Sequence, residues 1–141
     1  MTIQPVILIE LGVLLLALVT VESGGYFLTK VVRGHVPSNQ LQKNFFRAGH
    51  AHAAVLLVLS FAIISVLGYA QLDGILGFIA YNAVPAAAIL MPAGFFLSVL
   101  GTDPQKPNRL IWLLWLGAAS LTVGLLTAGI SLVVAGVSGL G

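Results

Sequence analysis

The stretch that decides the fold is FFRAGHAHAAVLLVLSFAIISVLGY, residues 45–69. Within it, residues 53–66 carry no charge, and two serines are their only polar side chains. A helix rises 1.5 Å per residue, so about 20 such residues cross the roughly 30 Å of hydrocarbon in a bilayer. A strand of a membrane barrel would instead show about ten residues of alternating polarity. Residues 45–69 therefore predict a membrane-spanning helix.

Three further stretches of this kind complete the prediction. Glu10 lies inside the first of them and no basic residue precedes it, so we expect a helix of the mature protein rather than a secretory signal. Polar segments rich in Gly, Pro or charge separate the stretches. We predict an all-α, polytopic integral membrane protein, with a single domain over residues 1–141 that forms an up-down four-helix bundle. Its expected spans are residues 5–28, 45–69, 75–100 and 110–137.

The composition of the chain supports a lipid environment. Of 141 residues, 59% are hydrophobic and 7% are charged, whereas about a quarter of the residues of a soluble domain are charged. Six basic residues against four acidic ones are too few for the clustered positive surface of a nucleic-acid-binding protein. The absence of cysteine excludes disulfides, thiolate metal sites and thiol catalysis. The partner indicated most directly is the lipid bilayer.

The distribution of basic residues predicts the orientation. All six lie in or beside the first and third connections: Lys30, Arg33, Lys43, Arg47, Lys106 and Arg109. Basic residues in short loops are retained on the cytoplasmic side. We therefore expect the loops 29–44 and 101–109 in the cytoplasm, both termini outside it, and the protein in a bacterial plasma membrane.

Ionisable groups inside the predicted spans are the candidates for chemistry, because such groups usually pair or line a polar path. Glu22 and His50 lie at matching depth, about 9 Å and 7 Å from the cytoplasmic ends of their spans, and Arg47 shares a helix face with His50. We expect Glu22, Arg47 and His50 to form a cluster that binds or relays a proton or small ligand, as in a channel or transporter. Tyr26, one turn from Glu22, and Asn82 on the third span are further candidates for this path.

The two histidines of the second span limit what metal or heme site is feasible. Residues two apart are separated by about 200° of helix rotation, so His50 and His52 point to opposite sides and cannot hold one ion together. His50-Ala51-His52 resembles the His-x-His pair of heme-copper oxidases, in which the two imidazoles serve two hemes on opposite helix faces. That resemblance implies a heme. A heme or metal site built from His50, His52 and Glu22 is thus an alternative, although the chain has only three histidines to act as axial ligands.

The fourth span carries a stripe of small residues that predicts close packing. Helices in lipid associate where small side chains let their backbones approach. An alternative function follows: a non-catalytic auxiliary or scaffold subunit that uses this face to dock a partner or a second copy in a larger complex. In the third span, Pro85 and Pro92 are expected to bend the helix. The stripe comprises Gly117, Ser120, Gly124, Ala128, Ser131 and Ala135.

Residues 44–55, NFFRAGHAHAAV, together with four spans and a long basic first connection, loosely resemble the membrane-associated eicosanoid and glutathione metabolism proteins. This resemblance implies a membrane-embedded enzyme. His52 and Val55 stand where that family has Asn and Glu, and the third span has no arginine, so the likeness covers topology and not the glutathione-binding residues. No nucleophile stands beside a base at a recognisable spacing, so the sequence favours a protein that is not an enzyme.

Overall fold

The computed structural model describes residues 4–140, and this part of the chain is all helical, without strands. Its four long helices are each long and apolar enough to cross a membrane, so the predicted helical class and the four apolar helices are confirmed. Short 3-10 turns, η1 and η2, precede α3 and α4. The elements are α1 (Pro5–Val32), α2 (Gln40–Leu67), η1 (Gly68–Ala70), α3 (Gly74–Leu97), η2 (Arg109–Ile111) and α4 (Trp112–Ser138).

The first connection is shorter than the sequence predicted, because α1 continues to Val32 and α2 already begins at Gln40. A capping box explains the early start of α2. The Asn39 side chain accepts a hydrogen bond from the Gln42 backbone N–H (2.9 Å), and the Gln42 side chain accepts one from the Asn39 backbone N–H (3.1 Å). Most of the expected loop 29–44 is therefore helical, and residues 33–39 alone form the connection.

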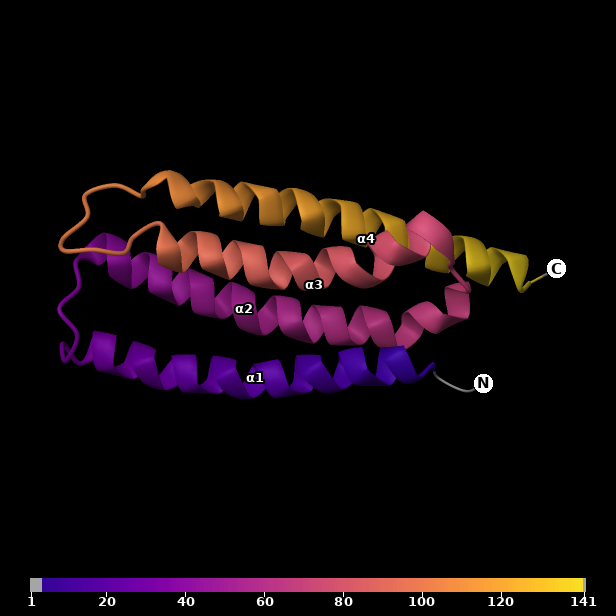
Figure 1. Cartoon of the computed structure of the whole chain (residues 1–141), viewed down its shortest axis with the longest axis horizontal. Coiled ribbons are helices and arrows are strands. Elements are labelled where there is room, and N and C mark those ends of the chain that lie inside the picture. Colours follow the sequence, from indigo (N-terminus) through magenta and orange to yellow (C-terminus); the bar gives the residue numbers. More distant parts are fainter. Residues whose placement is uncertain (1–3, 141) are drawn as a thin grey trace.

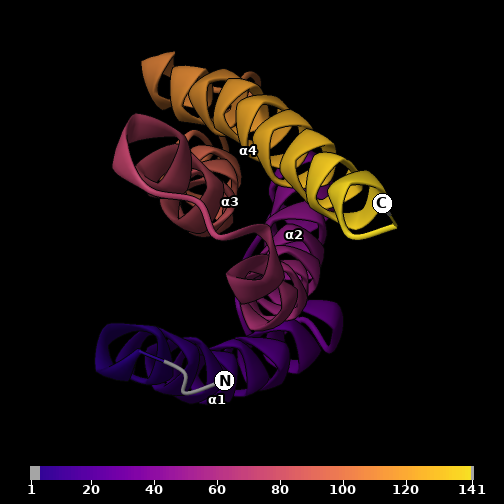
Figure 2. The same ribbon diagram turned by 90° about the vertical axis from the view of Figure 1, so that its right-hand side faces the viewer.

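Each helix packs mainly on its neighbours in the sequence. Within residues 4–140, α1 approaches α2 closely but neither α3 nor α4. Figure 2 shows α1 and α4 on opposite sides of the molecule with α2 and α3 between them. The four helices thus form an open arrangement, and most of the α1 surface is not covered by the rest of the chain.

Both chain termini lie at one end of the molecule, on the right of Figure 1, which we call the terminal end. The connections formed by residues 33–39 and 98–108 lie together at the opposite, connection end. Buried Gln42 holds them in place by donating hydrogen bonds to the carbonyl oxygens of Val99 (3.1 Å) and Gly101 (3.0 Å). The Asn39 amide donates to the Asp103 carboxylate (2.8 Å). These bonds fix the start of α2 against the segment that links α3 to α4.

The small-residue stripe of α4 packs against α3 of the same chain. A Cβ atom added to Gly117 would lie 2.6 Å from Cγ of Met91, and one added to Gly124 would lie 2.8 Å from Cγ2 of Val84. The Ser120 hydroxyl donates to the Ala83 carbonyl oxygen (2.8 Å). The close approach of another helix was predicted. The expectation that this face docks a partner or a second copy needs correction over residues 117–128, because α3 of the same chain covers that part of the stripe. That part of α4 is not free to bind a partner. Further along the stripe, Ser131 and Ala135 are half-buried and border a shallow cavity beside η1.

Candidate functional site

His50 lies in the interface between α1 and α2. A Cβ atom added to Gly24 would lie 3.3 Å from Nδ1 of His50, and one added to Gly25 would lie 3.6 Å from its Cε1. Two consecutive glycines on α1 thus leave room for the imidazole ring against the helix backbone. One helical turn away, the rings of Phe27 and Phe46 meet edge to face at 5.5 Å. His50 therefore packs in a tight interhelical contact.

His52 faces the other way, toward α3. Its ring centroid lies 4.9 Å from that of Phe95. Gly49 allows α3 to come this close, because a Cβ atom there would lie 2.8 Å from Cε2 of Phe96. The two imidazoles thus occupy different helix interfaces, in keeping with the rotation of about 200° between residues two apart.

The hydrogen bond of His52 sets the position of its proton. Nδ1 lies 2.8 Å from the carbonyl oxygen of Ala48, one turn earlier on α2. A carbonyl oxygen can only accept, so Nδ1 carries the hydrogen and donates it. In the neutral ring Nε2 is then left with its lone pair, as an acceptor or ligand atom.

This tautomer can be measured. In ¹⁵N NMR spectra of histidine-labelled protein in lipid, we expect one imidazole with a protonated Nδ1 and an unprotonated Nε2. The signal should disappear in the variant His52→Phe, which keeps an aromatic ring beside Phe95, while the signals of His35 and His50 remain. A His52 signal with the proton on Nε2 would contradict the hydrogen bond to Ala48.

The side chains of Glu22, Arg47 and His50 do not form the expected cluster within residues 4–140. Glu22 and His50 have the matching depth that was predicted, since His50 packs on Gly24, two residues from Glu22. However, Glu22 is exposed on the flank of α1, and Arg47 is exposed on α2. Within residues 4–140, no hydrogen bond or ion pair joins Glu22 to either side chain. The α1 face that meets α2 is formed by residues such as Leu14, Gly24 and Val31, and Glu22 points away from it.

Tyr26 and Asn82 do not join this group either. The ammonium group of Lys30 lies 4.6 Å from the centre of the exposed Tyr26 ring, in a cation–π contact. Asn82 is exposed, and its amide donates to the Phe78 carbonyl oxygen of its own helix (2.9 Å). It lies 13 residues before Phe95, or about 20 Å along α3 from the layer of His52. The polar path expected through Glu22, His50 and Asn82 is therefore not continuous in the described part of the chain.

His50, His52 and Glu22 also do not come together as ligands of one metal ion. Among residues 4–140, no three His, Cys, Asp or Glu side chains come together in a geometry that could hold a metal. His50 and His52 occupy separate interfaces, and Glu22 is exposed on a third surface. The candidate set of these three residues thus does not converge on one point.

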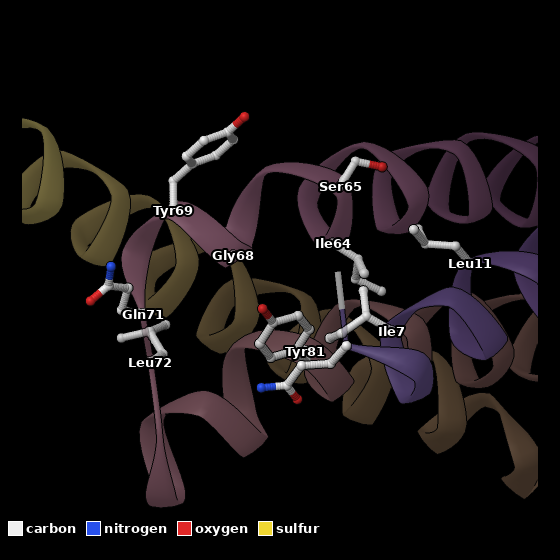
Figure 3. Close-up of a pocket in the computed structure, with 10 residues that line it drawn as sticks. Ile7, Leu11, Ile64, Ser65, Gly68, Tyr69, Gln71, Leu72 and Tyr81 are labelled. Atoms are coloured by element: carbon white, nitrogen blue, oxygen red, sulfur yellow. The ribbon is translucent and has the colours of Figure 1, made fainter. Parts of the chain in front are cut away.

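The structure contains a cavity that the sequence did not predict. A pocket of about 610 Å³ opens at the terminal end, where α1 begins and α2 turns toward α3. Figure 3 shows that its lining comes from α1, the end of α2, the η1 corner and Tyr81 of α3. The floor is apolar, while two phenols, two carboxamides and one hydroxyl supply the polar groups. The lining residues are Gln4, Ile7, Leu11, Ile64, Ser65, Gly68, Tyr69, Gln71, Leu72 and Tyr81.

The corner after α2 shapes this pocket. The helix tightens into the turn Gly68–Ala70, and Gln71 then adopts a left-handed backbone (φ 48°), as does Gly74 (φ 55°). The carbonyl of Leu72 packs directly on Gly77, where an added Cβ atom would lie 3.0 Å from the oxygen. This compact turn brings Tyr69 and Gln71 to one side of the cavity. Sequence reasoning treated residues 71–74 only as a break between spans, although aromatic and amide residues near a span end are a signal of the membrane interface.

No family model, curated protein or solved structure matches this chain. Function is therefore inferred from the geometry of the pocket and of the helix surfaces.

Proposed function

We propose that this chain is an integral membrane protein that binds a small amphipathic ligand in the pocket at its terminal end. Its helices cross the membrane in alternating directions, with the connection end in the cytoplasm and both termini outside. The support for this orientation is the charge distribution. The basic residues lie in or beside the connections, whereas Glu10 and Asp73 are the charged residues near the terminal end.

The cavity is the observation that carries the proposal. Its volume of about 610 Å³ falls within the range of roughly 300–1,000 Å³ typical of small-molecule sites. Such sites combine apolar walls with a few polar groups that orient the ligand. Here Ile7, Leu11 and Ile64 supply the walls, and the phenols of Tyr69 and Tyr81 supply hydrogen-bonding groups.

The lining also indicates the class of ligand. Among residues 4–140, no charged side chain lines the pocket. An ionised ligand would therefore have no charged partner in this lining. Phenol, amide and hydroxyl groups instead match a head group with hydroxyl or carbonyl oxygens. The ligand we propose is an uncharged amphiphile with a hydrogen-bonding head and an apolar tail, such as a monoacylglycerol.

Binding is proposed rather than transport, because the polar side chains of α1, α2 and α3 do not line one continuous path within residues 4–140. Asn82 bonds to its own helix, and His50 and His52 lie in separate interfaces.

Photolabelling tests this proposal. Protein in nanodiscs is irradiated with a monoacylglycerol that carries a diazirine in its acyl chain, and the labelled residues are located by mass spectrometry. We expect labels on α1 near Ile7 and Leu11 and on the segment 64–72. Ser65→Trp, which places an indole in the cavity, should reduce labelling about fivefold, equivalent to ~1 kcal/mol of binding free energy. Tyr81→Phe should reduce it less, because one hydroxyl is lost and the ring remains.

The matched control is Thr122→Trp, which adds the same indole to an exposed position of α4 that bonds only within its own helix. Its labelling should equal that of the wild type. Equal labelling of Ser65→Trp and Thr122→Trp, or labels spread evenly over all four helices, would overturn the proposed site.

A further inference from the structure

Glu22 is an acidic side chain on an uncovered surface in the middle of an apolar helix. It lies eight residues from Lys30, which corresponds to about 12 Å along α1. The side chain is exposed, and in residues 4–140 it makes no hydrogen bond. Carboxyl groups at such a depth in a membrane almost always face protein or water and have a partner. The position of Glu22 therefore indicates that another protein surface covers this side of α1.

The residues around Glu22 form a continuous stripe with the spacing of a helix–helix interface. Leu8, Leu15, Val19 and Tyr26 are 54%, 51%, 61% and 65% exposed. With Gly12 and Glu22 they alternate in steps of four and three residues, the period at which side chains of two packed helices meet. Gly12 has open space around the position of a Cβ atom, so a second helix could approach closely there. We call these six positions the outer stripe of α1.

We propose that the outer stripe is the interface of a homodimer, in which α1 packs against α1 of a second copy and the two Glu22 carboxyl groups hydrogen bond to each other. A two-fold axis along the membrane normal places identical residues at identical depth. A protonated carboxyl group has both a donor and an acceptor, so this side chain is complementary to itself. Figure 2 shows α1 at the edge of the helix arrangement, where none of the other three long helices of residues 4–140 lies beyond it.

Arg47 of a second copy is another candidate partner for Glu22, but it fits less well than the second Glu22. The contacts of His50 with Gly24 and of Phe46 with Phe27 fix how α1 and α2 run past each other. They place Arg47 about five residues, or roughly 7.5 Å, closer to the connection end than Glu22. Because side chains lean toward the N-terminus of their helix and the two helices are antiparallel, these two side chains also lean apart. Two Glu22 carboxyl groups related by the two-fold axis lie at the same depth, whereas Arg47 lies at a different depth from Glu22.

Cysteine crosslinking tests the dimer directly, because the chain contains no cysteine. The variant Val19→Cys, in proteoliposomes and under mild oxidation, should form disulfide-linked dimers. The matched control is Val133→Cys on α4, which is 66% exposed and distant from the outer stripe, and it should stay monomeric. Equal crosslinking of the two variants would overturn the proposal.

Substitution of the carboxyl group tests its role. In the Val19→Cys background, Glu22→Gln keeps a donor and an acceptor and should retain the crosslink, whereas Glu22→Leu should reduce it about tenfold, or 1.4 kcal/mol. Light scattering in detergent should give a dimer mass for wild type and Glu22→Gln and a monomer mass for Glu22→Leu. An undiminished dimer in Glu22→Leu, or a monomeric wild type that does not crosslink, would contradict the pairing. Because the pocket lies elsewhere, Ser65→Trp should leave the crosslink unchanged.

Discussion

Replacing Gly94 with valine should lower the free energy of unfolding by about 3 kcal/mol, at the upper end of the usual cost of overpacking. Gly94 lies where α3 crosses the start of α4. A Cβ atom there would collide with the backbone nitrogen of Leu114 and lie 2.9 Å from its Cα. A backbone cannot rotate away as a side chain can, so the two helices must separate. The measurement is the unfolding midpoint in mixed micelles.

The control for this substitution is Gly129→Val on α4. Gly129 is exposed, and no atom lies within 4 Å of the position that a Cβ atom would take. Its stability should stay within about 0.5 kcal/mol of the wild type, as for other surface substitutions. If Gly94→Val unfolded at the same midpoint as Gly129→Val, the close approach of α3 and α4 would be wrong.

Replacing Gln42 with leucine should cost about 2–3 kcal/mol, since it leaves several backbone groups without hydrogen bonds. The buried Gln42 side chain donates to the carbonyls of Val99 and Gly101 and accepts from the Asn39 backbone N–H. Leucine keeps a similar volume but makes none of these bonds. The segment 98–108 would keep only the hydrogen bonds from the Asn39 amide to Asp103 and Pro104, so trypsin should cleave after Arg109 more readily.

Gln40→Leu is the matched control, because Gln40 is exposed and its amide bonds only to Asn44 on the same helix. We expect little change in its unfolding midpoint or in its cleavage after Arg109. Identical behaviour of the two variants would show that Gln42 does not tie α2 to the segment 98–108.

The sequence predicts the four apolar helices well, because span length and hydropathy follow directly from the thickness of the hydrocarbon layer. It also places Glu22 and His50 at one depth, which depends only on counting residues along a helix. The rotation of each helix about its own axis is harder to predict from the sequence than its length or depth. Small changes in rotation decide whether Glu22 faces α2 or the outside, and in the structure the glycine pair at residues 24 and 25 is the part of α1 that lies against His50.

The small residues of α4 illustrate the same limit. Their spacing predicts that backbones approach, and Gly117 and Gly124 do lie against α3. Spacing alone does not identify which helix approaches, so a partner protein and α3 were equally compatible with it. The pocket was missed for a related reason. Tyr69 and Tyr81 are twelve residues apart and come together only through the turn at η1.

The hydrogen bonds that α1 makes within residues 4–140 all stay inside α1, its N-cap residue Gln4 or the turn that follows it. Its first turns border the pocket together with Ile64 and Tyr81, and no hydrogen bond joins them to these residues within the described part of the chain. A sideways displacement of these turns would break no hydrogen bond to the other helices of the described chain. In the proposed orientation, an amphiphile in the outer leaflet would then reach the pocket by separating two apolar surfaces, without breaking a hydrogen bond between them.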